Sequence, residues 1–287
     1  MSHQTVIVLD FGGQYNQLIA RRVRECGVYC EVKPYTTPLA DIRAMNPIGI
    51  IFTGGPNSVY DPKSPQVDPA IFTWGVPILG ICYGCQLMAH NLGGRVTEAQ
   101  DDSAREYGKT ETYFDSACKL FKGLPAQGIT WMSHGDYMEK VPEGFALVAH
   151  SDACPNVAIC DESRGFYGVQ YHPEVNHTEH GTDMIRNFLY EVCGAAGDWT
   201  MGDYKETAIR HAKTMGRRYE DCDFIVCHIG GGISISAHQH GRMIDGYDIV
   251  GGEGPMTPTR AGAVPVVAVL DYLKNHDSAE KRRVCQG

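Results

Sequence analysis

The sequence predicts an α/β protein whose first two-thirds form a doubly wound, mostly parallel sheet. Short apolar runs rich in β-branched residues alternate with patterns of helical spacing, and glycine-rich turns separate the two kinds of segment. The runs are almost uniformly apolar, as is typical of strands that are buried on both faces of a parallel sheet. In sheets of this kind the ligand site lies beyond the carboxyl ends of the strands.

Strand and helix patterns follow one another from the N-terminus. The first apolar run, residues 6–10, ends in Phe-Gly-Gly-Gln, and residues 15–26 then have helical spacing and stop at Gly27. The next expected elements are a strand at 28–32, a helix at 39–45 and strands at 48–52 and 76–79.

Two glycine pairs and one cysteine stand at three of these strand ends. Gly12 and Gly13 follow the first strand, Gly54 and Gly55 follow the third, and Cys82 follows the fourth. Because the carboxyl ends of parallel strands meet at one edge of a sheet, we expect the three turns to converge.

Cys82 stands in the turn between the fourth strand and a helical pattern at 85–92. Residues 80–84 are Gly-Ile-Cys-Tyr-Gly, the nucleophile-elbow pattern with cysteine in place of serine. A nucleophile on a strained strand-to-helix turn needs neighbours without side-chain bulk, because the chain crowds it from both sides. The start of a helix also favours the reactive thiolate. We therefore interpret Cys82 as a nucleophile.

Two other interpretations of Cys82 stay open on the local pattern alone. Cys82 and Cys85 form C-x-x-C, which is also the spacing of a redox pair. A buried cysteine is often only a small apolar side chain.

Beyond residue 107 the pattern changes to the alternation typical of antiparallel strands. Turn residues separate two of the runs closely enough to predict a hairpin. The expected elements are strands at 110–114 and 145–149, a polar loop at 131–136, a hairpin of 156–160 with 166–170, and a closing amphipathic helix at 182–192.

A thiolate nucleophile needs a base and a group that orients the base. His172 and Glu174 lie two apart on extended chain, so they project to the same side, and Pro173 restricts the backbone between them. In this interpretation His172 takes and returns protons while Glu174 fixes its tautomer. His134, in the expected loop, is a second candidate base.

The acidic and histidine side chains between residues 172 and 180 could instead bind a metal ion. Their spacings match neither H-E-x-x-H nor paired cysteines with paired histidines. We expect no metal site here, and interpret His177 and His180 as part of a solvent-exposed loop.

Composition limits the classes of function. The 287 residues suffice for one large or two ordinary domains, and the formal net charge of -9 argues against nucleic-acid and acidic-membrane partners. No apolar run approaches the ~20 residues that span a bilayer, and the N-terminus lacks a secretory signal pattern. Eleven cysteines without framework spacing indicate reduced thiols, so we expect a cytoplasmic location.

Five motifs follow in the order of a known family. Residues 4 to about 204 closely resemble the class I glutamine amidotransferase domain of the GMP synthetase family, which implies a flavodoxin-like fold. The opening at 10–14 and the Ser-His-Gly-Asp segment at 133–136 select this branch over those serving carbamoyl phosphate, CTP or anthranilate synthesis. The motifs are VLDFGGQY at 8–15, TGGP at 53–56, GICYGCQ at 80–86, MSHGD at 132–136 and GVQYHPEV at 168–175.

The resemblance implies a role for each motif residue. Cys82 would attack the side-chain amide of glutamine, and His172, with Glu174, would protonate the leaving ammonia. The backbone N–H groups of Gly55 and Tyr83 would stabilise the oxyanion. The other residues expected at the glutamine site are Gln86, Ser133 and His134, whereas Cys85 is expected to serve packing.

The resemblance also implies a reaction and a partner. The expected function is glutamine hydrolysis that supplies ammonia for the conversion of XMP to GMP. The Ser-Gly-Gly-Val-Asp-Ser loop of an ATP pyrophosphatase domain does not occur in the sequence. ATP and Mg²⁺ would therefore belong to a separate synthetase domain or subunit, while no cofactor is expected in this chain. The alternatives are a stand-alone glutaminase subunit of another class I amidotransferase, and an inactive chimeric fragment without kinase activity.

After residue 204 the pattern is a different one. A basic helix is expected at 205–219, and two strands, 224–229 and 233–238, flank a turn of three glycines. Such a turn can direct N–H groups at a phosphate, although a plain glycine hairpin fits as well. Since the turn lies between strands, it is not the strand-to-helix phosphate loop.

Residues 205–287 resemble an internal fragment of butyrate kinase, in the acetate and sugar kinase superfamily. The resemblance implies phosphate binding by Gly230, Gly231 and Gly232, and neutralisation of the transferring phosphoryl group by Arg260. Because a phosphotransferase closes two domains around its substrates and only part of one is matched, we expect no kinase activity. The matching segments are 228–234, 241–245 and 252–262.

Overall fold

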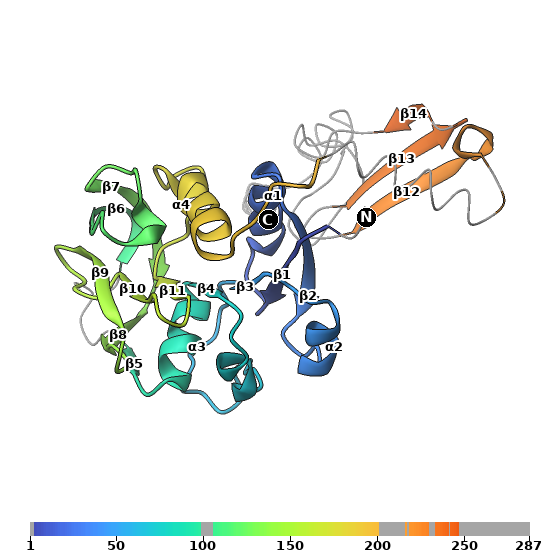
Figure 1. Ribbon diagram of the computed structural model, residues 1–287. Coiled ribbons are helices and arrows are strands. Elements are labelled where there is room, and N and C mark those ends of the chain that lie inside the picture. Colours follow the sequence, from blue (N-terminus) through green and yellow to red (C-terminus); the bar gives the residue numbers. More distant parts are fainter. Residues whose placement is uncertain are drawn as a thin grey trace, which may run out of the picture. The chain divides into compact units, whose positions relative to one another are not determined.

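A nine-stranded sheet is the frame of the first unit of the chain (Figure 1). Its order is β2-β1-β3-β4-β11-β10-β9-β6-β7; strands from β2 to β11 in this order run parallel, and those from β11 to β7 pair antiparallel. The predicted α/β class is confirmed. The strands are β1 (Thr5–Asp10), β2 (Tyr29–Pro34), β3 (Gly49–Phe52), β4 (Ile78–Ile81), β6 (Glu106–Phe114), β7 (Gln127–His134), β9 (Ala146–Ser151), β10 (Ala158–Asp161) and β11 (Phe166–Val169).

The computed structural model describes residues 3–98, 106–200, 216, 218–229, 233–240 and 242–246. The chain divides into two units, Met1–Met201 and Gly202–Gly287. Within the described ranges, no helix combines the length and the apolar character that crossing a bilayer requires.

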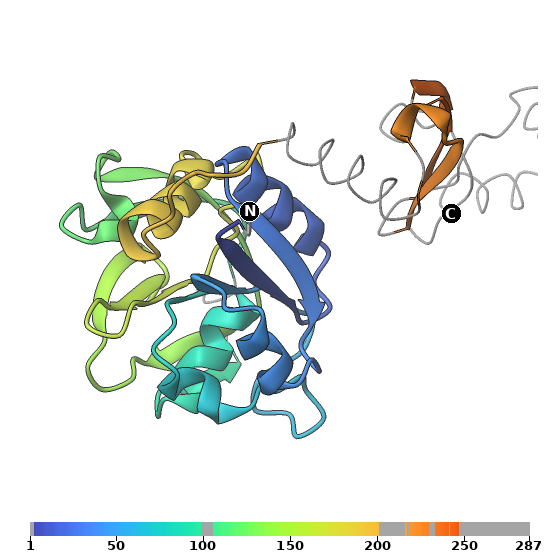
Figure 2. The same ribbon diagram turned by 45° about the vertical axis from the view of Figure 1, so that its right-hand side comes forward.

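Four α-helices flank the sheet: α1 (Asn16–Glu25), α2 (Leu39–Ala44), α3 (Tyr83–Asn91) and α4 (Gly181–Asn187). Figures 1 and 2 show α1 and α4 on one face and α2 and α3 on the other. Along β1, Val6 and Val8 pack with residues of α1 and α4, whereas Ile7 and Leu9 pack with residues of α2 and α3. This burial on both faces explains the uniformly apolar strands.

The parallel half follows the sequence prediction closely. Each expected strand and helix from β1 to α3 is present, and its bounds differ from the predicted ones by no more than two residues. Helix α1 ends where Gly27 adopts a φ of 75°, a left-handed conformation that favours glycine after a helix. The glycine turns therefore lie between a strand and the helix that follows it, as expected.

The antiparallel half departs from the prediction at one place. Residues 131–136, expected as a polar loop, continue β7 to His134 and, after a turn at Gly135, begin β8 (Asp136–Lys140), which pairs with β5 (Arg95–Glu98). The loop prediction is wrong because the buried side chains of Thr130, Met132 and His134 alternate with less buried ones, which is the two-residue period of a strand. The predicted hairpin is confirmed as the antiparallel pair β10–β11.

The closing helix and the segment after it complete the first unit. Helix α4 continues as a π-helical turn at Phe188–Val192, which together match the predicted helix at 182–192. Beyond it, Trp199 is buried and donates its backbone N–H to the carbonyl of Gly27 at 3.1 Å. Short 3-10 turns lie at Pro69–Thr73 and Lys119–Phe121.

In the second unit, a short 3-10 turn (Tyr219–Asp221) precedes an antiparallel sheet of β12 (Phe224–Ile229), β13 (Ile233–Gln239) and β14 (Arg242–Gly246). The two predicted strands are confirmed, and they pair antiparallel. Most of the helix expected at 205–219 lies outside the described residues. The proposed phosphate-binding residues, Gly230, Gly231, Gly232 and Arg260, also lie outside them.

Candidate active site

Cys82 occupies the turn between β4 and α3. Its backbone has φ 51° and ψ -108°, a conformation that residues other than glycine seldom adopt. Two strands hold it: the Cys82 N–H donates to the carbonyl of Val169 at 2.8 Å, and the Gly84 N–H donates to that of Thr53 at 3.1 Å. The strained elbow is thus fixed by the chain on both sides of β4.

Glycine is required at both flanking positions of the elbow. A Cβ at Gly80 would lie 2.6 Å from the carbonyl oxygen of Gly84 and 2.7 Å from the backbone nitrogen of Cys85. A Cβ at Gly84 would lie 2.6 Å from the carbonyl oxygen of Phe52. These distances are shorter than van der Waals contact, so a side chain at either position would displace the elbow.

His172 and Glu174 form a buried pair just beyond the end of β11. The His172 Nδ1 and the Glu174 Oε1 are 2.7 Å apart, and Glu174 is 0% exposed. Two hydrogen bonds fix the backbone of His172: its N–H donates to the Trp131 carbonyl at 3.0 Å, and the Thr178 hydroxyl donates to the His172 carbonyl at 2.6 Å. With Nδ1 engaged, Nε2 is the ring nitrogen left for chemistry.

The charge state of His172 follows from its neighbours. Burial alone lowers the pKa of His172, but hydrogen bonds to Cys82 and Glu174, together with their charges, raise that pKa to about 10. The imidazolium is therefore favoured beside the sulfur. In that state His172 stabilises a thiolate and can donate a proton to a leaving group.

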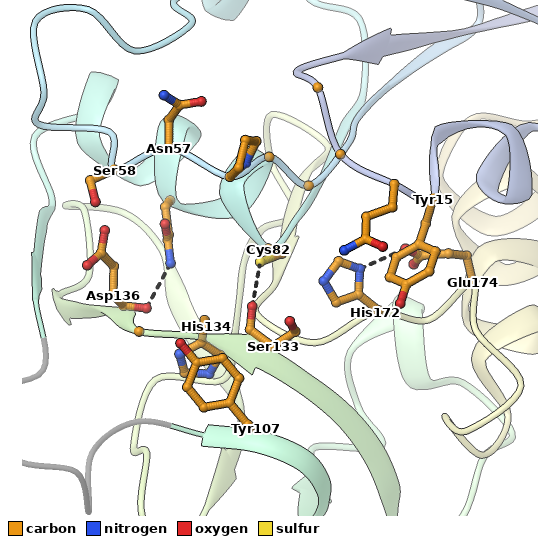
Figure 3. Close-up of a pocket in the computed structure, with 18 residues that line it drawn as sticks. Tyr15, Asn57, Ser58, Cys82, Tyr107, Ser133, His134, Asp136, His172 and Glu174 are labelled. Carbon is orange, nitrogen blue, oxygen red and sulfur yellow. Dashed lines mark hydrogen bonds and ion pairs between the residues drawn. The ribbon is translucent and has the colours of Figure 1, made fainter. Parts of the chain in front are cut away.

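A cavity of about 380 Å³ opens over the elbow. The carboxyl ends of β1, β3, β4 and β11 contribute to its wall, as expected for a parallel sheet, and Figure 3 shows His172 between Cys82 and Glu174. The expected convergence of Gly12 and Gly13, Gly54 and Gly55, and Cys82 is present, since all five residues line this cavity.

Gly54 and Gly55 bring the backbone close to the nucleophile. A Cβ at Gly54 would lie 3.0 Å from the Cε1 of His172 and 3.7 Å from the Cβ of Cys82. A Cβ at Gly55 would lie 2.9 Å from the carbonyl oxygen of Phe11. Tyr83 is the first residue of α3, so its N–H has no partner within the helix.

The other predicted site residues also line the cavity. Gln86 donates its side-chain N–H to the carbonyl of Asp136 at 2.9 Å, and the carbonyl of Ser133 lies 3.8 Å from the Cys82 sulfur (Figure 3). His134 lies on the cavity wall and is buried, whereas His172 is the histidine that pairs with a carboxylate. The residues predicted for the glutamine site that line this one cavity are Gly55, Cys82, Gln86, Ser133, His134, His172 and Glu174. Tyr83 follows Cys82 directly as the first residue of α3.

Two residues beside the His172–Glu174 pair were not singled out from the sequence. The ring of Tyr15 packs edge-on against His172 with 5.3 Å between centroids, and the side-chain N–H of Gln170 points at the Cys82 sulfur from 4.0 Å. Both lie within the quoted motifs, so membership of a motif was the available signal.

Cys85 lies on α3 one turn after Cys82 and does not line the cavity. It is fully buried in a small apolar cluster with Ala89, Met138 and Ile159, and burial raises the pKa of its thiol. Both Cys82 and Cys85 are free thiols. This environment favours the packing interpretation of Cys85 over the redox pair.

The histidine-rich segment after the His172–Glu174 pair has contacts of its own. His177 packs on the ring of Trp131 with 4.7 Å between centroids, the Glu179 carboxylate accepts the Ile129 N–H at 2.9 Å, and both His177 and Glu179 are exposed. His180, also exposed, faces Asp183.

Comparisons with known proteins match this geometry. Residues 7–192 match the family described as glutamine amidotransferase class-I, and residues 200–285 match the acetokinase family. Both family resemblances expected from the motifs are confirmed at this level.

Curated relatives named GMP synthase [glutamine-hydrolyzing] are about half identical to the chain. The protein of Clostridium perfringens (strain 13 / Type A) is 53% identical over 231 residues, which cover 80% of this chain and 44% of that protein. The protein of Caldicellulosiruptor saccharolyticus is 52% identical over 236 residues, which cover 82% and 45%. The chain therefore spans less than half the length of these relatives. Since 231 residues exceed the first unit, the alignment also enters the second.

Solved structures share the fold of the first unit. A protein from Thermoplasma acidophilum, described as a putative subunit of GMP synthase, has a TM-score of 0.61 and 28% identity, covering 72% of this chain and 98% of that one. A glutamine amidotransferase from Thermotoga maritima has a TM-score of 0.54 at 18% identity, covering 68% and 100%, which is a likeness of fold alone.

Proposed function

This chain belongs to the class I glutamine amidotransferase family, and on that premise we propose that its first unit hydrolyses the side-chain amide of glutamine. The observation that carries the proposal is the His172–Glu174 pair beside Cys82, on a strained strand-to-helix elbow that opens into a cavity. Nucleophile, base and orienting carboxylate occur together in the arrangement that acyl transfer needs.

The first half-reaction uses Cys82 and His172. The Cys82 sulfur attacks the side-chain carbonyl carbon of glutamine and forms a tetrahedral intermediate. His172 then donates the proton at Nε2 to the departing nitrogen, the carbon–nitrogen bond breaks, and ammonia leaves a thioester on Cys82. The pKa of His172, raised to about 10, keeps the proton available at neutral pH.

The oxygen of the tetrahedral intermediate carries a negative charge, and two backbone N–H groups are proposed to donate hydrogen bonds to it. The Tyr83 N–H lies at the start of α3, where the helix dipole also favours a negative charge. The Gly55 N–H is the second proposed donor, because the adjacent glycines admit the substrate close to the backbone.

The second half-reaction regenerates the enzyme. Water attacks the thioester, His172 Nε2 accepts a proton from it, and the carbon–sulfur bond breaks to give glutamate and free Cys82. Glu174 holds Nδ1 through both halves, which keeps Nε2 directed at the reacting atoms.

We further propose that the ammonia serves the conversion of XMP to GMP. The relatives that are about half identical bear the name GMP synthase [glutamine-hydrolyzing], which supports this acceptor over others. The partner would be an ATP pyrophosphatase domain, on the same chain or a separate one. ATP and Mg²⁺ would act in that partner, and the glutaminase chemistry uses only side chains and backbone of the first unit.

The test is glutamate release by the full chain, with and without a GMP synthetase ATP pyrophosphatase domain added together with XMP, ATP and Mg²⁺. We expect Cys82→Ala to lower kcat by about 10⁴-fold or more, because it removes the group that forms the covalent intermediate. Cys30→Ser is the matched control, since Cys30 is buried between β2 and α1 and does not line the cavity.

Unchanged glutamine hydrolysis in Cys82→Ala would overturn the proposal. Hydrolysis without GMP formation would favour the second candidate, a glutaminase subunit for another class I amidotransferase. No hydrolysis under any of these conditions would favour the inactive fragment.

A further inference from the structure

Two thiols and a carboxylate meet in the antiparallel half of the first unit, and none of them lines the active-site cavity. Cys118 directly precedes the 3-10 turn Lys119–Phe121, Cys160 lies on β10, and Glu162 lies in the turn of the β10–β11 hairpin. One ligand atom of each residue lies within 4.8 Å of the others. Both cysteines are 4% exposed, whereas Glu162 is exposed.

The surrounding structure holds the carboxylate toward the thiols. The Asp161 carboxylate accepts the N–H groups of Ser163 at 2.9 Å and Arg164 at 3.2 Å, which fixes the hairpin turn. The Glu162 Oε1 accepts the Lys119 N–H at 3.1 Å, so it is tied to the segment that carries Cys118. The second oxygen, Oε2, meets only the exposed Lys119 ammonium, at 3.9 Å, among the described ion pairs.

The sulfur atoms of the two thiols lie within 4.8 Å of each other. Cys118 and Cys160 lie far apart in sequence, and Cys160 is held in the sheet between β9 and β11. Two sulfurs kept together by separate rigid elements form a preorganised dithiol.

A buried tyrosine neighbours the two thiols. Tyr167 lies opposite Cys160 in the β10–β11 pair (strands labelled in Figure 1) and is 0% exposed. Cross-strand partners project to the same face of a sheet, so the Tyr167 side chain lies on the same face as that of Cys160. Among the described residues, no hydrogen bond of standard geometry satisfies this hydroxyl. Such an orphaned polar group calls for a ligand or a bound water.

We propose that Cys118, Cys160 and Glu162 bind a thiophilic divalent cation of the zinc class. Two thiolates at about 2.3 Å and one carboxylate oxygen at about 2.0–2.2 Å are three of the four ligands of a tetrahedral site. A water would take the fourth position, within reach of the Tyr167 hydroxyl. Binding releases the two thiol protons, and the hydrogen bond from Lys119 to Oε1 would orient the carboxylate as an outer-shell partner.

A disulfide between the two cysteines is the competing use of the same sulfurs. A disulfide would need an external oxidant, and it would not explain why Glu162 and Tyr167 lie beside the two sulfurs. The mixed set of two sulfurs, one oxygen and a neighbouring hydroxyl fits a cation better.

The test titrates the reduced, chelator-treated full chain with Cd²⁺ and follows the ultraviolet thiolate-to-cadmium charge-transfer band, with Zn²⁺ as competitor. All samples carry Cys82→Ala, so that the active-site thiol does not contribute. We expect one Zn²⁺-competed ion per chain, with the band lost in Cys118→Ser and in Cys160→Ser. Glu162→Gln and Tyr167→Phe should each weaken binding by about 10-fold.

The controls separate ligand loss from misfolding. Cys26→Ser removes another buried thiol of the same unit and should leave the band intact. Glu162→Gln changes an exposed side chain, so its weakened affinity should occur with an unchanged circular dichroism spectrum. A band that persists in the Cys118→Ser/Cys160→Ser double variant would overturn the proposal, as would a chain that carries only Cys82→Ala and binds neither ion.

Discussion

The nucleophile and the base of the candidate site are held by different means. Cys82 depends on backbone: glycines on both sides admit the strained turn, and neighbouring strands accept its amide hydrogen bonds. His172 depends on side chains: Glu174 holds its ring and Thr178 holds its carbonyl. Substitutions that add atoms near Cys82 should therefore lower activity, whereas near His172 the damaging substitutions should be those that remove a charge or a hydrogen bond.

This difference follows from the two halves of the sheet. The parallel strands β3 and β4 are buried on both faces, and their ends have no space for additional side chains. His172 follows β11, where the sheet changes from parallel to antiparallel pairing, and its N–H reaches the edge strand β7 at Trp131. Both halves of the sheet thus contribute contacts that position the proposed base, whereas the proposed nucleophile is positioned by the parallel half alone.

The largest effect is expected for Glu174→Gln. The amide cannot fix the reactive tautomer or stabilise the imidazolium, so kcat for glutamine hydrolysis should fall by about 10³–10⁴-fold. Steady-state assays measure this, with Glu179→Gln as control, because Glu179 is an exposed acid of the same segment. A fall of only a few-fold would mean that His172 does not depend on its carboxylate.

The second prediction concerns pH. His172 has a folded pKa of about 10, above its usual 6.5, so its charge stabilises the fold fully below about pH 6.5 and this stabilisation is lost as the pH rises toward 10. The change should be on the order of a few kcal/mol in the free energy of unfolding. Denaturant titrations of the wild-type chain and of His172→Gln/Glu174→Gln should diverge at the acid end and converge at the alkaline end. Parallel profiles would contradict the raised pKa.

A smaller effect is expected for Gly80→Ala on the nucleophile side. The added methyl would collide with the backbone of Gly84 and Cys85, so the free energy of unfolding should fall by about 2–3 kcal/mol, and hydrolysis should fall with the displaced elbow. Gly93→Ala is the control: Gly93 has a φ of 89° and nothing within 4 Å, so only conformational strain of about 1–2 kcal/mol applies. Equal losses of activity in both variants would show that crowding at the elbow is not decisive.

The smallest effect is expected for Cys85→Ala. Removing one buried sulfur from the cluster with Met138 and Ile159 should cost about 1 kcal/mol of stability and leave glutamine hydrolysis unchanged. Thermal unfolding and the hydrolysis assay measure the two quantities. If the variant instead lost a sensitivity to oxidants that the wild-type chain has, Cys82 and Cys85 would be a redox pair.

Sequence reasoning succeeded where local patterns decide the structure. The apolar runs of β1, β3 and β4 and their glycine turns indicate both the strands and the edge at which they meet. The three residues of the proposed triad could be singled out because Cys82 lies in an elbow motif and His172 lies two residues from Glu174. Each of these signals is contained in a few consecutive residues.

The sequence did not predict features that depend on contacts between residues far apart in the chain. Residues 131–134 belong to a strand because they pair with β6, and this pairing with a distant segment is not visible in their mixed polar and apolar sequence. The packing of Tyr15 on His172 depends on how α1 meets the end of β11. Cys118 and Cys160 approach each other only when β6, β9 and β10 have paired, and no local sequence spacing predicts this.

The amide hydrogen bonds of the elbow have a consequence for entropy. Because Cys82 and Gly84 donate to the chain of two neighbouring strands, the freedom of the sulfur-bearing residue is lost once, when the protein folds. An incoming glutamine then has to surrender only its own freedom of motion on binding. The rigid elbow thus shifts an ordering step from each encounter with a substrate to the single event of folding.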